Sequence, residues 1–357
     1  MYLNFEDKLA EGIEIPEGNY CKKAYTYELE SEDAWALNTA LLTGRPLLVL
    51  GRPGVGKSQL AFAAAAALKW QAELFSVTAR TEPEELLYRY DAVARLAQAQ
   101  LGVQSTQDAQ DTQDAEQKLL PHNYVTPGVF WQAFAPNIQT NGEPISEPVS
   151  STIDNSIDNP IGTVLLIDEI DKADHDVCNS LLDVLDQKRF FCPHLPKGKQ
   201  WITANTNLNP HLVIFTSNNE RDLPPAFIRR CVVHTMDAGK DIKCWLKRRA
   251  KRHFPENSSN VNYRLLWHEI ELEDDNNGNG VAQSVIDFAI EQFAQQEAKA
   301  EQGYLMPNLA EFLDFLTAVA NHANTAESEA EKKEKIKNAV NWVKQFTLTK
   351  SDQFKGQ

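Results

Sequence analysis

The stretch "LVLGRPGVGKSQLAFAAAA", from Leu48 to Ala66, decides how the rest of the sequence is interpreted. Its leading apolar residues are typical of the end of a buried strand, and its alanine-rich end favours a helix. Between them, Gly51–Ser58 has the pattern G-x-x-x-x-G-K-S in the strand–loop–helix context of a phosphate-binding loop. Glycines let backbone N–H groups surround phosphate oxygens, and the helix N-terminus adds partial positive charge. The stretch therefore predicts a site for a nucleoside triphosphate.

Each side chain of this loop has an expected role. Lys57 would contact the β- and γ-phosphates, and the Ser58 hydroxyl would coordinate Mg²⁺. A glycine-rich turn that binds nothing is the alternative, but the presence of both Lys57 and Ser58 argues against it. The residues predicted to bind the nucleotide are Gly51, Arg52, Pro53, Gly54, Val55, Gly56, Lys57, Ser58 and Gln59.

The composition is that of an ordinary globular protein. The 357 residues are 42% hydrophobic and 24% charged, which allows a full core and a second domain. No apolar run approaches the length of a membrane span, and the beginning "MYLNFEDKLAEG" is acidic, unlike a signal peptide. The five cysteines form no C-x-x-C pair, which argues for reduced thiols. We therefore expect a cytoplasmic protein without a membrane span.

The net charge of −15 argues against nucleic acid as the default partner. One basic stretch, "KDIKCWLKRRAKRHF", does occur at Lys240–Phe254. A solvated helix face, or an edge that meets an acidic surface on a neighbouring subunit, is the favoured interpretation. A DNA contact is the less favoured one.

A second motif, "LLIDEID", narrows the class of phosphate-binding protein. The apolar run Val164–Ile167 is followed directly by Asp168 and Glu169. Acids just outside a core strand are costly unless a cation or an ordered water uses them. We expect Asp168 to hold Mg²⁺ together with Ser58, and Glu169 to orient and deprotonate the attacking water. Asp171 is interpreted as a cap of the following helix or as a subunit contact.

A third stretch, "VIFTSNNERDLPPAFIRRC", completes the predicted site. Asn218 follows a strand that we expect between the other two, where its amide could hydrogen-bond the γ-phosphate and the attacking water. An ordinary turn asparagine is the alternative. Arg229 and Arg230 follow a short helix, and one of them is expected to reach the nucleotide of a neighbouring subunit and stabilise transition-state charge there. The other would be a plain surface charge.

Other phosphate-binding classes fit less well. A GTPase needs D-x-x-G and a base-reading N/T-K-x-D motif. "TKSD" occurs at Thr349–Asp352, but in the polar tail and not after a strand, so we interpret it as a coincidence. No signature resembling that of ABC transporters is present.

Strands alternate with helices as far as Met236, which predicts an α/β fold with a parallel sheet covered by helices. The predicted helices include one that is capped by Ser31 and one over Glu82–Leu101. After the sheet we expect a smaller all-helical lid domain. The predicted domains are an N-terminal segment at 1–30, the α/β nucleotide-binding domain at 31–237 with low-complexity insertions at about 98–120 and 136–160, and the helical lid domain and tail at 238–357.

Taken in order, "GRPGVGKS", "LLIDEID", "TSN" and "FIRRC" resemble an AAA+ ATPase. The segments "ARTEPEELLYRYDAVARL", "TPGVFWQAF" and "FTSNNERDLPPAFIRRC" look like the MoxR-like group within that class. The resemblance implies a P-loop fold and a ring, expected to be a homo-hexamer, with ATP and Mg²⁺ at the subunit interfaces. It also implies chaperone-like remodelling or activation of a protein client, often one with a von Willebrand factor A domain.

The resemblance leaves several points open. By analogy, the insert between the second and third strands, from "YRYDAVARL" to "TPGVFWQAF", would project near the pore of the ring. Its Tyr124, Phe130 and Trp131 could face a client there, although core positions are the commoner use. The lid position where relatives carry a basic residue corresponds to Leu305 and Met306, and nothing basic is close. A nucleic-acid motor, McrB-like or helicase-loader-like, and an ATP-gated scaffold with little turnover are the alternative functions.

Overall fold

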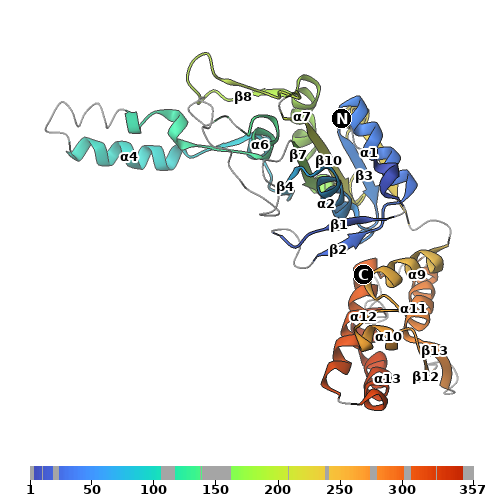
Figure 1. Ribbon diagram of the computed structural model, residues 1–357. Coiled ribbons are helices and arrows are strands. Elements are labelled where there is room, and N and C mark those ends of the chain that lie inside the picture. Colours follow the sequence, from blue (N-terminus) through green and yellow to red (C-terminus); the bar gives the residue numbers. More distant parts are fainter. Residues whose placement is uncertain are drawn as a thin grey trace. The chain divides into compact units, whose positions relative to one another are not determined.

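The computed structural model shows two compact units, which we describe separately (Figure 1). The α/β unit comprises Met1–Gly51 and Gly56–Met236, and the C-terminal unit comprises Arg52–Val55 and Asp237–Gln357. The residues that the structure describes are 4–9, 11–18, 24–105, 117–136, 138, 162–207, 209–237, 241–273, 280–300, 307–326 and 328–348.

The α/β unit is built on a parallel sheet with the strand order β11-β3-β10-β7-β4. The strands are β3 (Leu47–Gly51), β4 (Gln71–Ser76), β7 (Thr163–Asp168), β10 (His211–Ser217) and β11 (Val232–Met236). The expected α/β fold with a parallel sheet is confirmed, and so is the expected place of β10 between β3 and β7. Because all five strands run in one direction, their carboxyl ends meet at one edge of the sheet.

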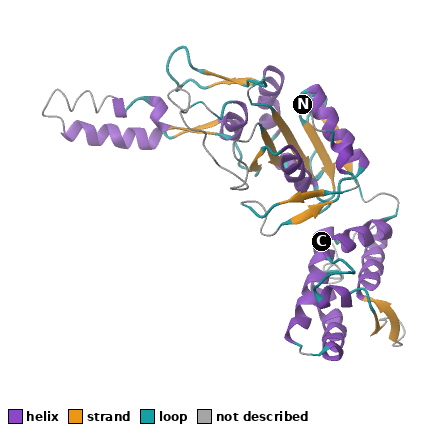
Figure 2. Ribbon diagram, in the orientation of Figure 1, coloured by secondary structure: helices purple, strands orange, loops and turns teal. Residues whose placement is uncertain are grey.

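Helices cover both faces of this sheet (Figure 2). One face packs against α6 (Val129–Phe134), α7 (His175–Gln187) and α8 (Pro225–Ile228) through a single apolar cluster. The other face is covered by α1 (Ser31–Thr43) and α2 (Lys57–Leu68). The strands are therefore buried on both sides, which explains why their sequences are almost continuously apolar rather than alternating.

Helix α1 begins one residue away from the predicted cap. Glu30, not Ser31, is the N-cap, and it forms a reciprocal capping box with Asp33. The carboxylate of Asp33 accepts the backbone N–H of Glu30 at 3.1 Å. The helix ends at Gly44, whose φ of 63° is most readily adopted by glycine.

The segment predicted as one helix over 82–101 contains a strand. It forms α3 (Pro83–Leu87), β5 (Tyr88–Tyr90) and α4 (Ala92–Ser105), and β5 pairs with β6 (Val125–Pro127). The alternation Tyr-Arg-Tyr supports this strand, but a two-stranded ribbon needs a partner far along the chain, which local periodicity cannot indicate. The ribbon carries α4 outward from the sheet (Figure 1).

The core use of the insert aromatics is confirmed for two of the three. Phe130 and Trp131 are 0% and 1% exposed, and both belong to the apolar cluster of the α/β unit. Tyr124 is partly buried.

Smaller elements complete the α/β unit. They are η1 (Phe5–Lys8), β1 (Ile13–Ile15) paired with β2 (Tyr25–Tyr27), η2 (Pro121–Tyr124), η3 (Ile170–Lys172), and β8 (Arg189–Phe191) paired with β9 (Trp201–Thr203). Most of the two predicted insertions, the "TKSD" tetrapeptide, Leu305 and Met306 lie outside the described residues.

The C-terminal unit is mainly helical and has its own apolar core. Its elements are α9 (Ile242–His253), α10 (Val261–Leu265), β12 (Glu269–Glu273), β13 (Gly280–Ser284), α11 (Val285–Ala300), α12 (Leu309–His322), η4 (Ala323–Thr325) and α13 (Glu329–Phe346). The ribbon of β12 and β13 was not expected, since the sequence analysis predicted helices only. Its strand β13 directly precedes α11, so the apolar residues of both read as one helical pattern.

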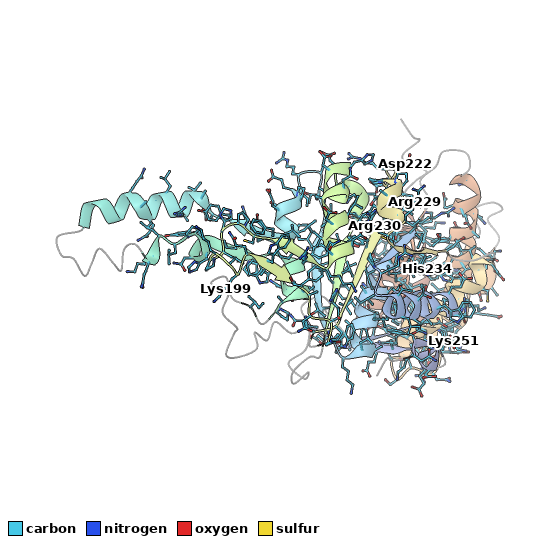
Figure 3. All side chains as sticks on the ribbon, turned by 90° about the horizontal axis from the view of Figure 1, so that it is seen from above. Lys199, Asp222, Arg229, Arg230, His234 and Lys251 are labelled. Atoms are coloured by element: carbon cyan, nitrogen blue, oxygen red, sulfur yellow. The ribbon has the colours of Figure 1, made fainter. Side chains whose placement is uncertain are left out.

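The basic stretch of the sequence forms helix α9. Its buried residues, Trp245, Leu246, Arg249 and Ala250, line one side of the helix. Its other basic side chains are exposed; Lys251 is labelled in Figure 3. This is the geometry of an amphipathic helix with a solvated basic face. Among the described residues, no helix is long and apolar enough to cross a membrane.

Candidate nucleotide-binding and hydrolysis site

The phosphate-loop motif joins the end of β3 to the start of α2, at the carboxyl edge of the sheet. Gly54 and Gly56 have φ values of +75° and +109°, a conformation that residues with a Cβ rarely adopt. Gly56 is the N-cap of α2, and Lys57 is the first residue of the helix. The first backbone N–H groups of α2 have no partner within the helix, so this end suits an anion.

Lys57 lies almost fully buried at the centre of the site, with 6% of its surface exposed. Its ammonium donates hydrogen bonds to the carbonyl oxygen of Gly51 at 2.8 Å and to Oδ1 of Asn218 at 2.6 Å. Burial lowers the pKa of Lys57, and nearby carboxylates, led by that of Asp168, oppose this shift. The predicted phosphate-binding lysine and the predicted asparagine therefore meet directly.

Ser58 and Asp168 form the second contact of the site. The Ser58 hydroxyl donates to Oδ1 of Asp168 at 2.8 Å. Two neighbouring ligands of an octahedral Mg²⁺ are about 3 Å apart, because each lies about 2.1 Å from the ion at a right angle to the other. Oxygen donors at this separation fit Mg²⁺, which is usually held by one or two protein ligands together with substrate phosphates.

Thr216 hydrogen-bonds both Asp168 and Glu169. It is fully buried on β10, its hydroxyl donates to Oδ1 of Asp168 at 2.5 Å, and its oxygen accepts the backbone N–H of Glu169 at 2.9 Å. One threonine thus holds the side chain of the predicted metal ligand and the backbone of the predicted base.

Glu169 adopts a left-handed backbone conformation, with φ 59° and ψ 49°. Such a conformation is uncommon for a residue with a side chain and is found mainly where surrounding contacts impose it. Its Oε1 accepts from Nδ2 of Asn218 at 3.2 Å, and its Oε2 pairs with the ammonium of Lys172 at 2.5 Å. This contact raises the pKa of Lys172.

Asp171 is not a cap of the following helix, and the N-cap of α7 is Asp174. Asp171 is 1% exposed, and its Oδ2 accepts the backbone N–H groups of Asn218 and Glu220, both at 3.0 Å. The interpretation as a helix cap is wrong because a carboxylate three residues after a strand can turn back to the neighbouring strand, and local sequence does not show which way it turns. The alternative of a subunit contact stays a prediction.

Arg229 and Arg230 lie together at the end of α8, and Figure 3 labels both near Asp222. The guanidinium of Arg230 donates to Asp186 on α7 at 2.7 Å and to the carbonyl oxygen of Ala226 at 3.1 Å. Arg229 is exposed, and its guanidinium makes no hydrogen bond or ion pair with any described residue. Neither arginine contacts the described cluster around Lys57.

The structure thus brings together Lys57, Ser58, Asp168, Glu169 and Asn218 from three neighbouring strands, as the sequence analysis expected them to meet. Sequence reasoning missed Thr216 and Lys172. A signal for Thr216 was its place directly after the apolar run Leu212–Phe215 of a buried strand. Lys172 lies three residues after Glu169 in the sequence, but its contact depends on the turn η3.

Comparison with known families is consistent with this geometry. Residues 46–231 match the model of the AAA domain family, dynein-related subfamily. The match covers more than half of the chain. It includes the phosphate loop, the acidic end of β7, the polar end of β10 and the arginine pair. The chain therefore belongs to the AAA domain family.

Among solved structures, the chain resembles several at low identity. A point variant of RuvB from Thermotoga maritima is 14% identical over 87% of this chain and 67% of that one, with a TM-score of 0.42. The Thermotoga maritima RuvB Holliday junction branch migration motor is 13% identical over 87% and 66%, with a TM-score of 0.40. A Cytophaga hutchinsonii protein assigned as an ATPase is 14% identical over 94% and 83%, with a TM-score of 0.36. No curated protein matches the chain.

Proposed function

We propose that this chain is an Mg²⁺-dependent AAA+ ATPase that hydrolyses ATP to ADP and phosphate. The observation that carries the proposal is the continuous contact from Lys57 through Asn218 to Glu169, at 2.6 Å and 3.2 Å, beside the Ser58–Asp168 pair. This arrangement places a buried cation, a polar amide and a carboxylate around one position at the carboxyl edge of the sheet. Family membership supports the proposal, since members of this class use the same loop for ATP.

Each residue would act on a different part of the reaction. The backbone of Gly51–Gln59 and the ammonium of Lys57 would hold the phosphates, and Ser58 and Asp168 would hold Mg²⁺, which supplies charge neutralisation at the phosphates. Glu169 would orient the attacking water and accept its proton. Asn218 would hydrogen-bond the γ-phosphate and, through its contact with Glu169, keep that carboxylate oriented toward the phosphate.

We assign the arginine that acts in trans to Arg229. A transition-state arginine must be free to leave its own surface, and Arg230 is held by Asp186 and by the carbonyl of Ala226. Arg229 is exposed, while its backbone is anchored by the guanidinium of Arg45, which bonds the carbonyl oxygens of both Arg229 and Arg230. With this assignment, each Arg229 would act at the nucleotide of the next subunit in the homo-hexameric ring that the sequence resemblance implies.

The motor would be of the MoxR-like type and would remodel or activate a protein client, with a von Willebrand factor A domain as a candidate feature of that client. The sequence resemblance supports this, and the net charge of −15 favours protein over nucleic acid.

The test is phosphate release with Mg²⁺–ATP over a protein concentration series, beside Glu169→Gln and an exposed acid of α3, Glu84→Gln, as the matched control. We expect activity per subunit to rise with concentration, and Glu169→Gln to lose about 10³-fold while still binding ATP, as expected for loss of a general base. Glu84→Gln should behave like the parent protein. ATP binding without turnover at any concentration would favour the scaffold alternative, and stimulation by DNA that disappears with salt would favour the nucleic-acid motor.

A further inference from the structure

We infer that Asp171 is a positioning residue that sets the place of Asn218 in the site, and that it acts through backbone hydrogen bonds rather than through its charge. The inference rests on the proposed function and extends it to a residue that does not itself face the nucleotide. It is carried by the contacts of one buried carboxylate oxygen.

The geometry links Asp171 to the catalytic amide in two steps. Oδ2 of Asp171 accepts the N–H of Asn218 and the N–H of Glu220, both at 3.0 Å, and so clamps the chain on either side of Asn219. Asn219 has a φ of +60°, a left-handed conformation that an unrestrained asparagine adopts only part of the time. The clamp therefore holds the tight turn in which the strand β10 ends.

The same turn delivers the Asn218 side chain to its partners. Its Oδ1 accepts from Lys57 at 2.6 Å, and its Nδ2 donates to Glu169 at 3.2 Å. A shift of the Asn218 backbone would disturb both bonds at once, because the side chain spans the two partners. Fixing the backbone is thus the simplest way to fix the amide between the lysine and the base.

The cost of burying Asp171 supports a role in the site. Its Oδ1 is buried and has no hydrogen-bond partner among the described residues. Burying a carboxylate with one oxygen unsatisfied is expensive, so this residue is a poor choice for stability alone. Such costs are typically retained where a position is held for function.

The turn η3 joins this clamp to Glu169. It runs from Ile170 to Lys172, directly after Glu169, so Asp171 and the predicted base share one turn. The same turn therefore positions both groups: Glu169 because it directly precedes the turn, and Asn218 because Asp171 accepts the two backbone hydrogen bonds around it.

The test compares Asp171→Ala and Asp171→Asn, alone and combined with Asn218→Ala. The alanine variant loses the one oxygen that accepts both N–H groups, whereas asparagine keeps a carbonyl oxygen that can accept both of them. We expect Asp171→Ala to lower kcat by about 10²-fold, the effect of misplacing a catalytic group by about 1 Å, with the Kd of a fluorescent ATP analogue unchanged. Asp171→Asn should retain most of the parent kcat.

The double variant separates positioning from a general structural effect. If Asp171 acts through Asn218, then Asp171→Ala should cost little more kcat in an Asn218→Ala background than Asn218→Ala costs alone. Asp176→Ala, which removes an exposed acid in the first turn of α7, is the matched control and should leave kcat unchanged. Additive losses of kcat in the double variant would overturn the inference. An Asp171→Asn variant as inactive as Asp171→Ala would also overturn it, in favour of an effect of the charge.

Hydrogen exchange tests the clamp without any turnover. The amides of Asn218 and Glu220 should exchange at least about tenfold faster in Asp171→Ala and stay protected in Asp171→Asn. Unchanged protection in Asp171→Ala would overturn the inference even if the protein is an active ATPase. A parent protein with no turnover would instead contradict the proposed function while leaving this measurement valid. If Asp171→Ala does not fold, the Asp171→Asn variant decides. Retained amide protection and kcat in this variant support the inference, and their loss rejects it.

Discussion

The two units of this protein use buried polar residues in different ways. In the α/β unit, Lys57, Asp171, Thr216 and Ser217 gather at the carboxyl edge of one sheet, while other buried polar residues, such as the hydrogen-bonded pair Asp33 and His234, lie outside this group. In the C-terminal unit, buried polar residues are found on several separate elements. Asn262 on α10, for example, donates to the carbonyl oxygen of Ala320 at 3.0 Å and to Asn324 at 2.6 Å.

The contrast teaches how to separate a site from a structural contact. Asn262 connects elements that are already packed, and Ser284 caps α11 through Asp287. At the sheet edge, by contrast, polar atoms contact one another in a continuous cluster that includes a left-handed glutamate. Strain and concentrated polarity together indicate a place where the fold gives up stability for chemistry.

The largest expected effect concerns the arginine pair. Arg229→Ala should lower kcat about 10³-fold, within the range known for arginines supplied to a neighbouring site, whereas Arg230→Ala should cost much less because its side chain is engaged with Asp186. Phosphate release measures both. Mixing Arg229→Ala with Glu169→Gln should restore part of the activity, because some interfaces then combine an intact glutamate with an intact arginine. Equal losses in the two arginine variants, or no recovery on mixing, would contradict the assignment.

A smaller effect should appear in the C-terminal unit and only in stability. Asn262→Ala removes two hydrogen bonds and leaves a buried carbonyl of α12 without its donor, so it should lower the free energy of unfolding by about 2–3 kcal/mol. Urea unfolding measures this, and kcat of the folded variant should be unchanged. A fall in kcat without a loss of stability would break the distinction between the two kinds of polar residue.

The smallest effect tests a polar residue of the α/β unit that lies outside the cluster. His211 begins β10, at the opposite end of the strand from Asn218, and its ring contacts Phe134 at 4.9 Å between centroids. Burial lowers the pKa of His211 from its ordinary value of 6.5 to about 4, and the charge of Lys188 adds to this shift. The comparison predicts an effect on stability but none on chemistry.

The sign of this effect follows from which state binds the proton. The unfolded chain protonates His211 near pH 6.5, whereas in the folded chain the pKa is about 4. Its contribution to stability is therefore complete above pH 6.5 and is lost as the pH falls toward 4. Between pH 7 and pH 5 the loss is about 2 kcal/mol. His211→Phe should reduce the pH dependence of urea unfolding by this amount, and an unchanged pH dependence would show that His211 is not held neutral.

Much of the site could be predicted because its residues lie in short, recognisable stretches of sequence. The phosphate loop needs glycines and a lysine at fixed spacing within one strand–loop–helix unit, so Gly51–Ser58 was visible without any tertiary information. Asp168, Glu169 and Asn218 were visible because each follows a run of apolar residues that must be a buried strand. Parallel strands then bring these ends to one edge.

The structure alone determined how those residues are held. Asp171 and Thr216 hydrogen-bond atoms of the neighbouring strand segment, and Lys172 pairs with Glu169 across the turn η3. Which atom a short polar side chain reaches depends on the register of the neighbouring strands. The choice between Arg229 and Arg230 likewise depends on Asp186, which is distant in sequence. The ribbons of β5 with β6 and β12 with β13 were missed for the same reason, since a short strand is defined by its partner.

The sequence by itself therefore determined the fold class and the chemical groups of the site, because apolar runs and glycine spacing act locally. The tertiary structure decided which of those groups contact one another and which neighbouring residues fix their positions. Hydrogen bonds of about 3 Å between separate strands are set by packing and register, and neither is encoded in any one segment of the chain.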